Sequence, residues 1–247
     1  MAQMKISVCI PVYNESKIIA DTARTLSSYL EEHFGRRPDG SPDYEIVFSD
    51  DGSTDGSGDI VRSLGLDGVK VTGYGKNRGK GCAVRTAVLA SEGDVVMFTD
   101  SDLAYGTDVI ERFYSCLSAE GAPDAAVGSR NISKDGYEGY TFVRKAASIL
   151  YIKFLSAAGG LKLSDSQCGC KAFRAGPAKQ IFSRCGVDGF AFDFEALLWA
   201  DKLGFRVAEL PVRVLVHGDS KVRLLRDSLK MLRDVSRMKK EIRKKNI

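Results

Sequence analysis

Histidine is almost missing from this chain of 247 residues, which holds only His33 and His217. Its six cysteines are scattered, and Cys168-Gly169-Cys170 has one residue between the two cysteines where a zinc knuckle has two. We therefore expect no Cys/His zinc site and no catalytic histidine. Scattered cysteines in apolar surroundings are typical of reduced thiols in the cytosol.

Long apolar runs are also missing. The best candidate, residues 146–158, contains Lys153 and is shorter than the about 20 apolar residues that span a bilayer. The first residues lack the charged-then-apolar layout of a signal peptide, so we expect none. These features favour a globular protein that stays in the cytoplasm.

Charge is distributed unevenly along the chain. The net charge is +4, but residues 219–247 hold 11 Lys and Arg against 4 Asp and Glu, which leaves −3 on residues 1–218. Such asymmetry indicates a polyanionic partner, either a membrane or a nucleic acid. Because the tail has no interleaved aromatic residues and no known nucleic-acid module, we expect no nucleic acid as a partner.

The tail has a helical period. Its apolar residues recur every three or four positions: Val222, Leu225, Leu229, Leu232, Val235, Met238 and Ile242. The pattern predicts a basic amphipathic helix, which either lies on a membrane surface or packs on the domain or on a second copy of the chain. We accordingly divide the chain into a domain over residues 1–218 and a C-terminal helix over 219–247.

The remaining pattern alternates strands with helices. Predicted strands lie at 5–10, 44–49, 69–72, 95–99, 125–128, 170–173 and 207–216. Predicted helices lie at 16–34, 60–64, 82–91, 107–117, 141–158 and 192–203. This alternation predicts an α/β fold with a Rossmann-like, mostly parallel sheet flanked by helices. Pro211 breaks the last strand, which places it at an edge of the sheet or at a bulge.

Acidic residues follow three of these strands. Asp100 and Asp102 end the apolar run 95–99, Glu15 follows the first strand, and Asp50 ends the second. Ligands of open α/β sheets bind outside the carboxyl ends of the strands. Two carboxylates one residue apart face the same way in an extended segment, which suits a divalent cation holding a diphosphate. Asp and Ser are also good helix caps, and the residues alone leave both interpretations open.

Neither of two candidate loops matches a known phosphate-binding motif in full. The segment 10–15 lacks the glycines of a dinucleotide site, which disfavours NAD. The segment 73–81 nearly forms a P-loop but has Tyr74 and Gly81 at two required positions. We still expect its backbone amides and Lys80 to approach a phosphate at the start of the next helix.

Taken in order, the motifs resemble those of a known family. They are Pro11-Val12-Tyr13-Asn14-Glu15, Asp50-Asp51-Gly52-Ser53-Thr54-Asp55-Gly56, Asn77-Arg78-Gly79-Lys80-Gly81, Asp100-Ser101-Asp102, Gly128-Ser129-Arg130, Arg144-Lys145, 165–173 and Gly218-Asp219-Ser220-Lys221. The set, over about residues 5–235, resembles the inverting family 2 glycosyltransferases with the GT-A fold. The later motifs resemble the polyprenyl-phosphate branch, with a pattern nearest the dolichyl-phosphate glucose synthases.

The resemblance implies a role for particular residues. It implies Mg²⁺ or Mn²⁺ at Asp100 and Asp102, and catalytic roles for this pair, Arg130 and Arg144. The residues implied to bind the nucleotide sugar are Pro11, Tyr13, Glu15, Asp50, Lys80 and Asp100. Those implied to bind the acceptor phosphate are Arg130, Arg144, Lys145, Arg213 and Lys221. Asp193 and Glu195 lie where related enzymes carry an acidic residue, and their roles stay open.

The implied reaction transfers a hexose from a nucleotide sugar to polyprenyl phosphate. Mannose synthases of the branch often carry Gln where this chain has Ala104, which favours a UDP-hexose, and glucose, over GDP-mannose. A mannosyltransferase using GDP-mannose, a non-lipid acceptor and a binding protein without turnover remain alternatives. We further expect a peripheral location on the cytoplasmic face of a membrane, through residues 219–247, and allow for a homo-oligomer.

Overall fold

The computed structural model of the chain describes residues 4–138, 145, 149, 152, 160–215, 235, 238 and 242. Within these residues no helix has both the length and the apolar character needed to cross a membrane. The predicted helix 141–158 falls mostly outside the described residues, as does most of the predicted C-terminal helix.

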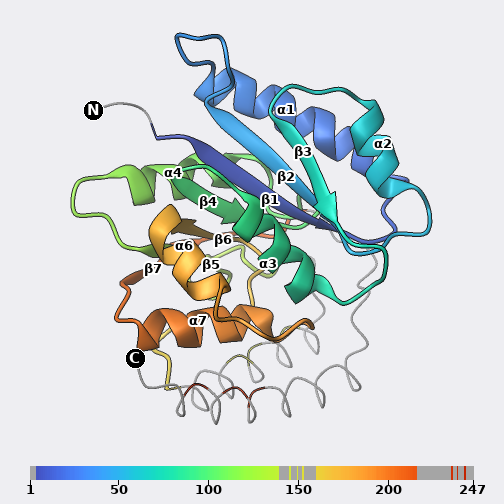
Figure 1. Cartoon of the computed structure of the whole chain (residues 1–247). Coiled ribbons are helices and arrows are strands. Elements are labelled where there is room, and N and C mark those ends of the chain that lie inside the picture. The colour runs from blue at the N-terminus through green and yellow to red at the C-terminus, as the bar shows by residue number, and fades with distance from the viewer. Residues whose placement is uncertain are drawn as a thin grey trace.

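Among the described residues, seven strands form one sheet in the order β3-β2-β1-β4-β6-β5-β7 (Figure 1). The strands are β1 (Ile6–Val12), β2 (Tyr44–Asp50), β3 (Val69–Gly73), β4 (Val95–Phe98), β5 (Ala125–Ser129), β6 (Lys171–Arg174) and β7 (Val207–Pro211). Only β6 runs antiparallel to its neighbours β4 and β5. The predicted α/β class with a mostly parallel sheet is confirmed.

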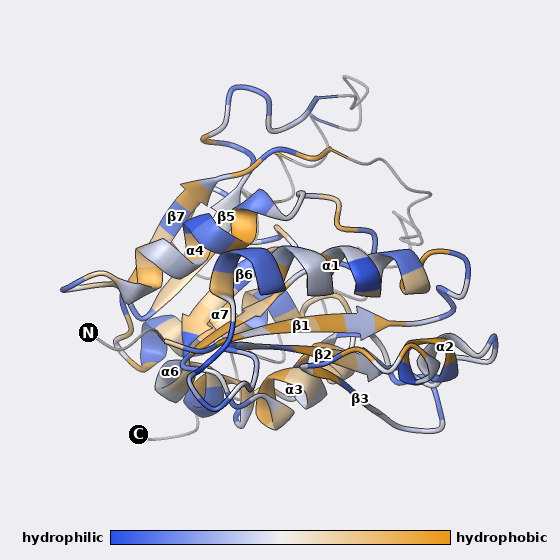
Figure 2. Ribbon diagram, turned by 90° about the horizontal axis from the view of Figure 1, so that it is seen from above, coloured by the Kyte–Doolittle hydropathy of each residue, from blue (hydrophilic) through white to orange (hydrophobic). Residues whose placement is uncertain are grey.

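Helices cover both faces of the sheet. They are α1 (Ile19–Phe34), α2 (Ser57–Ser63), α3 (Lys80–Ala90), α4 (Asp108–Ser118), α6 (Ala175–Phe182) and α7 (Phe192–Lys202). Figure 2 shows α1 and α4 on one side of β1, with α3 and α6 on the other. In β4, Val95 and Met97 join the core under α1 and α4, whereas Val96 and Phe98 join the core under α3, α6 and α7. This double burial explains why β4 is a continuous apolar run.

Helix α6 was not predicted from the sequence, and several element boundaries differ from the prediction. Helix α1 begins at Ile19, and Ser16 does not cap it: the backbone N–H of Ser16 donates to the carboxylate of Asp55 at 2.9 Å. Strand β7 ends at Pro211 and does not continue to 216. It lies at the edge of the sheet, as its proline predicts, because proline has no N–H for a ladder bond.

The described residues of the C-terminal segment are part of the core. Val235, Met238 and Ile242 are helical and only 4%, 1% and 8% exposed. They belong to the same core cluster as Trp199 of α7, and the ammonium of Lys202 donates to the carbonyl oxygen of Ile242. At these three positions the apolar stripe packs on the domain. The division at residue 218 stays a prediction.

Candidate active site

The loops that follow β1 and β2 are joined by hydrogen bonds. The N–H of Asp51 donates to the carbonyl of Val12 at 2.8 Å. The N–H of Asn14 donates to the hydroxyl of Ser53 at 3.0 Å, and the N–H of Thr54 returns a bond to the Asn14 side chain at 2.9 Å. The two loops therefore form one rigid rim at the carboxyl edge of the sheet.

Asp51 shapes the loop after β3 and does not face the edge. Its buried carboxylate accepts hydrogen bonds from the Tyr74 hydroxyl at 2.7 Å and the Asn77 amide at 2.9 Å. It also accepts from the backbone N–H groups of Arg78 and Gly79, at 2.8 Å and 2.9 Å. This positioning role was not predicted, because the sequence does not distinguish the two members of the Asp50-Asp51 pair.

Several amides of this glycine-rich loop are engaged within the protein. Besides the two that Asp51 receives, the N–H groups of Gly81 and Cys82 donate to the carbonyl of Asp188, at 2.9 Å and 3.3 Å. These are amides of the first turn of α3, where a phosphate would otherwise bind. These four amides are therefore not free to bind a phosphate, and a contact of the remaining loop amides with a phosphate stays a prediction. Lys80 contacts the acidic edge through Asp100.

Asp100 and Asp102 lie directly after the central strand β4, as predicted. Helix α1 fixes the turn between them, because the hydroxyl of Thr22 donates to the carbonyl of Ser101 at 2.7 Å. Asp102 accepts a hydrogen bond from the N–H of Ala104 at 3.1 Å. Burial, and secondly the negative charge of Asp100, raise the pKa of Asp102. Two carboxylates held this close favour a cation between them.

Lys80, the first residue of α3, supplies a positive charge at this point. Its ammonium donates to one oxygen of Asp100. Burial disfavours the charged ammonium, but the carboxylates of Asp100, Asp193 and Asp102 outweigh this cost and raise the pKa of Lys80. The site therefore combines acidic and cationic groups within one hydrogen-bonded unit.

Gly169 packs directly against Asp100. A Cβ atom at Gly169 would lie 2.6 Å from Oδ2 of Asp100, closer than real Cβ contacts allow. The N–H of Gly169 donates to the hydroxyl of Tyr105 at 3.1 Å. A side chain at the glycine between the two cysteines would therefore force the Asp100 carboxylate to move.

The two acidic residues of α7 have structural partners. Asp193 is buried and forms an ion pair of 2.7 Å with the fully buried Lys171. Burial raises the pKa of Asp193, against the opposing effects of Lys171 and Lys80. Glu195 accepts hydrogen bonds from the N–H of Gly186, 3.0 Å from each carboxylate oxygen. Asp193 thus supports the strand β6, and Glu195 holds the loop before α7.

Arg130 forms a buried ion pair. Its Nε and Nη2 donate to the two oxygens of Asp165 at 2.7 Å and 3.0 Å. Although burial acts to raise the pKa of Asp165, the hydrogen bonds and charge of Arg130 lower it on balance. Of the other residues implied to bind the acceptor, Lys145 is exposed, whereas Arg144 and Lys221 lie outside the described residues.

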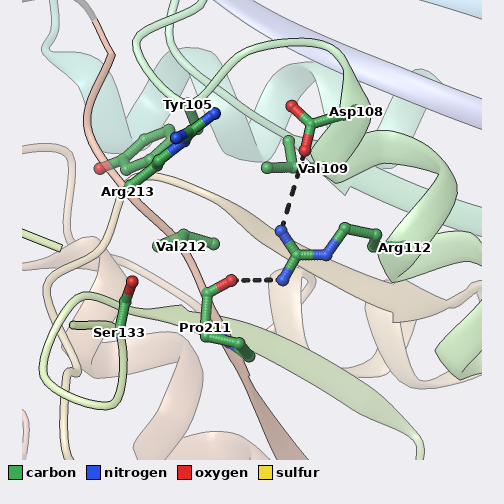
Figure 3. A pocket seen from close by; sticks show the side chains of 8 residues that line it. All are labelled: Tyr105, Asp108, Val109, Arg112, Ser133, Pro211, Val212 and Arg213. Carbon is green, nitrogen blue, oxygen red and sulfur yellow. Dashed lines mark hydrogen bonds and ion pairs between the residues drawn. The ribbon is translucent and has the colours of Figure 1, made fainter. Parts of the chain in front are cut away.

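Arg213 lines a separate pocket of about 200 Å³ (Figure 3). The lining residues are Tyr105, Asp108, Val109, Arg112, Ser133, Pro211, Val212 and Arg213. Arg112 donates to the carbonyl of Pro211 and lies 3.9 Å from Asp108. Tyr105 connects this pocket to Gly169, and through it to Asp100.

The comparisons with known proteins identify the family. The family model described as glycosyl transferase family 2 matches residues 7–182, from β1 to the end of α6. The chain belongs to this family. The matched range includes Asp100, Asp102, Lys80 and the rims formed by the loops after β1, β2 and β3.

This family 2 glycosyltransferase has relatives of similar sequence. It is 31% identical over 222 residues to a dolichyl-phosphate beta-glucosyltransferase of Trichomonas vaginalis, covering 87% of this chain and 65% of the relative. It is 28% identical over 248 residues to the dolichyl-phosphate beta-glucosyltransferase of Saccharomyces cerevisiae, covering 93% and 72%. The chain thus spans about two thirds of the length of these relatives.

Solved structures confirm the GT-A fold. The glucosyl-3-phosphoglycerate synthase of Mycobacterium tuberculosis, solved with Mn²⁺, UDP and phosphoglyceric acid, superposes with a TM-score of 0.68 at 20% identity. The match covers 100% of this chain and 81% of the synthase. At this identity the likeness concerns the fold alone.

In this glycosyltransferase the residues implied to bind the nucleotide lie at the ends of β1 and β2. Pro11 lies within β1, and Tyr13 follows the strand and is 38% exposed. The N–H of Glu15 donates to the hydroxyl of Ser57, the first residue of α2, at 2.9 Å. Asp50 accepts a hydrogen bond from the N–H of Ser53 at 2.8 Å. These four residues share one edge with the acidic pair, while Arg213 lies in the separate pocket. Among the described residues, no group of three or more His, Cys, Asp or Glu is arranged to hold a metal ion.

Proposed function

We propose that this glycosyltransferase transfers a hexose, with glucose preferred, from a nucleotide sugar to polyprenyl phosphate, inverting the anomeric carbon. One observation carries the proposal. The pair Asp100 and Asp102 is presented by the central strand beside Lys80, in a chain whose relatives are named dolichyl-phosphate beta-glucosyltransferases. Ala104 favours a UDP-sugar over GDP-mannose.

The donor is expected to lie along the carboxyl edge of the sheet. Pro11, Tyr13, Glu15 and Asp50 would hold the nucleotide, since they occupy the ends of β1 and β2 next to the acidic pair. Tyr13 supports this placement because an exposed aromatic ring offers a surface on which a base can stack. Asp50 and Glu15 supply acceptors for base or ribose hydrogens.

A divalent cation, Mg²⁺ or Mn²⁺, fits Asp100 and Asp102. Both are hard oxygen ligands, and the pKa of Asp102 is raised first by burial and then by the negative charge of Asp100, which a cation would offset. With only two carboxylates present, the diphosphate and water would complete the coordination. When bound, the cation would neutralise charge on the departing nucleoside diphosphate as a Lewis acid.

The protein side chains position the reactants and balance charge. A lipid monophosphate is anionic and already nucleophilic at neutral pH, so the reaction needs no strong general base. Asp193, a buried carboxylate near Lys80, is already engaged in an ion pair with Lys171, and the proposed reaction does not require it to act as a base. Lys80, which contacts Asp100, would lie where negative charge develops on the leaving diphosphate, and preorganised charge of this kind lowers the barrier.

The acceptor phosphate would be bound by the cations Arg130, Arg144, Lys145, Arg213 and Lys221. Two nitrogens of Arg130, Nε and Nη2, donate hydrogen bonds to the carboxylate of Asp165, and this bidentate contact fixes the guanidinium plane. A fixed guanidinium loses little entropy when it binds an oxyanion. Arg130 and Arg144 would thereby act in catalysis by holding the attacking phosphate near C1 of the sugar.

Residues 219–247 would bring the enzyme to the cytoplasmic face of a membrane. Their net charge of +7 is suited to anionic lipids. Because Val235, Met238 and Ile242 are buried in the core, these residues are not available for insertion into the bilayer. The contact would therefore depend on charge more than on apolar insertion.

Product formation with paired donors and acceptors tests the proposal. UDP-glucose and GDP-mannose are each combined with undecaprenyl and dolichyl phosphate, and lipid-linked sugar is followed together with the released nucleotide. We expect transfer from UDP-glucose that is abolished by EDTA and restored by Mg²⁺ or Mn²⁺. Asp102→Asn should reduce it by at least about 100-fold with the fold intact, because a metal ligand is lost.

The matched control is Asp67→Asn, which changes an exposed carboxylate that pairs with Arg36. Its activity should equal that of the wild type. Transfer that resists both EDTA and Asp102→Asn would contradict the metal role. Transfer to a soluble acceptor, with no lipid-linked product, would support the alternative of a non-lipid acceptor. Preference for GDP-mannose would reassign the donor.

A further inference from the structure

Tyr137 lies in the segment between Arg130 and the predicted acceptor-binding residues further along the chain. It is 8% exposed, and its hydroxyl donates to the side-chain oxygen of Asn131 at 2.8 Å. The amide nitrogen of Asn131 in turn donates to the carbonyl of Ser164. One end of the ring is thus anchored to the segment that precedes β6.

Two cations lie over the ring of Tyr137. The guanidinium carbon of Arg130 and the ammonium nitrogen of Lys145 are each 5.5 Å from its centroid. Both distances are within the about 6 Å range of cation–π attraction. A single aromatic ring therefore brings together two side chains that are separated by 15 positions in the sequence and that both carry positive charge.

The two cations differ in how they are held. Arg130 is fixed by the bidentate bond to Asp165, and that pair is electrically close to neutral. Lys145 is exposed, and a lysine side chain has high rotamer entropy when nothing restrains it. The face of an aromatic ring restrains such an ammonium without neutralising it, because the attraction involves the ring quadrupole and no opposite charge.

We propose that Tyr137 is a positioning residue for the anionic acceptor. Its ring lies within cation–π distance of both the ammonium of Lys145 and the fixed guanidinium of Arg130, and thereby preorganises both cations for a phosphate monoester. The inference rests on the proposed function, since it concerns binding of polyprenyl phosphate at that site. It assigns the effect to the aromatic face of Tyr137 and not to its hydroxyl.

Two substitutions separate the ring from the hydroxyl. Tyr137→Phe keeps the aromatic face and loses the bond to Asn131, whereas Tyr137→Leu keeps an apolar side chain and loses the face. We expect Tyr137→Leu to raise the KM for polyprenyl phosphate, and the Kd of a short polyprenyl phosphate measured by calorimetry, by about tenfold. Tyr137→Phe should stay within about twofold of the wild type, and neither should change the KM for the nucleotide sugar.

A double-mutant cycle with Lys145→Met tests whether the effect passes through the ammonium. In the Lys145→Met background, Tyr137→Leu should raise the Kd by a clearly smaller factor than in the wild type. If Tyr137 had a purely structural role, Tyr137→Leu would raise the Kd by the same factor in the wild-type and Lys145→Met backgrounds. Tyr114→Leu is the matched control, because the Tyr114 hydroxyl bonds to the backbone of Met4 and its ring lies against Phe34.

The inference is overturned if Tyr137→Phe binds the lipid phosphate as weakly as Tyr137→Leu, if the effect is equal in both backgrounds, or if the wild type binds no polyprenyl phosphate. A failure of the proposed function would give a different experimental result. Wild-type protein that binds the lipid phosphate but forms no sugar-linked lipid would contradict the proposed transfer, while the binding series would still decide the role of Tyr137.

Discussion

Acidic residues with the same appearance in the sequence have different tasks in this protein. Asp50 and Asp51 are neighbours, yet Asp51 is buried under the loop after β3 and receives four donors from that loop. Asp100 and Asp102 remain at the edge, where Lys80 contacts the first of them. Asp193 is paired with a buried lysine. The surroundings of each carboxylate, and not its type, decide whether it can meet a ligand.

Gly169 gives a sharp test of how tightly Asp100 is held. Gly169→Ala introduces a methyl group 2.6 Å from Oδ2 of Asp100, so this carboxylate must move. A displacement of about 1 Å in an active site costs on the order of 100-fold in rate. We expect hexose transfer to fall by about 10- to 100-fold while the thermal midpoint changes by only a few degrees.

The control for this change is Gly176→Ala in α6. A Cβ atom there meets nothing within 4 Å, so activity should be unchanged, and alanine should slightly stabilise the helix. Equal activity of Gly169→Ala and the wild type would show that Asp100 tolerates movement. That result would argue against a rigid metal-binding pair.

At the scale of elements, the candidate active site is built by loops that constrain one another. The rim after β1 and β2 is joined by backbone and side-chain bonds, and Asp188 closes the first turn of α3. The spacing of strands and loops can be read along the chain, but these cross-links join segments far apart in sequence. They also engage four amides in the region where the sequence predicts a phosphate contact.

The C-terminal segment gives a prediction at this scale. Deleting residues 219–247 would also remove Val235, Met238 and Ile242 from the core, so charge substitutions are the better experiment. We expect a triple variant, in which Lys239, Lys240 and Lys244 are each replaced by Gln, to float less with vesicles that contain anionic lipid. Each basic residue contributes about 1 kcal/mol to the free energy of binding near such a surface. The wild type should lose the same binding as salt is raised.

The control substitutes three exposed cations elsewhere, namely Lys17, Arg24 and Lys162→Gln. It changes the net charge equally and should leave flotation unchanged. Equal losses in the two triple variants would point to net charge alone. Binding to neutral vesicles at high salt would contradict an electrostatic contact.

At the scale of the whole molecule, the pair Arg130–Asp165 predicts how stability depends on pH. The pKa of Asp165 is lowered in the folded protein, and an unfolded Asp titrates near about 3.9. A lowered pKa means that the pair contributes fully to the free energy of unfolding above the unfolded pKa. The contribution is lost as the pH falls through the folded pKa.

Asp165→Asn should therefore destabilise the protein strongly at pH 7, by about 3 to 5 kcal/mol, because it leaves the buried Arg130 without its partner charge. The difference from the wild type should shrink near pH 3. Urea unfolding at the two pH values measures it, with Asp67→Asn as the exposed control. A difference that is the same at both pH values would contradict this account.

The sequence by itself determined the fold class and the position of the acidic pair after the central strand. The alternation of strands and helices predicts a mostly parallel sheet, and the apolar run of β4 that ends in Asp100 and Asp102 predicts an acidic edge. Both are local: periodicity follows from backbone geometry, and parallel strands place their carboxyl ends together. Pro211 likewise indicated an edge strand, since proline lacks the N–H that a central strand needs.

The tertiary structure decided what each residue contacts. The reversal of β6, the burial of Asp51, the carboxylate beside Gly169 and the two cations over Tyr137 all depend on segments that are distant in the chain. The same holds for the C-terminal stripe, in which Met238 packs on the domain although its period is equally suited to a membrane. Local pattern sets which face is apolar, and only packing determines what covers that face.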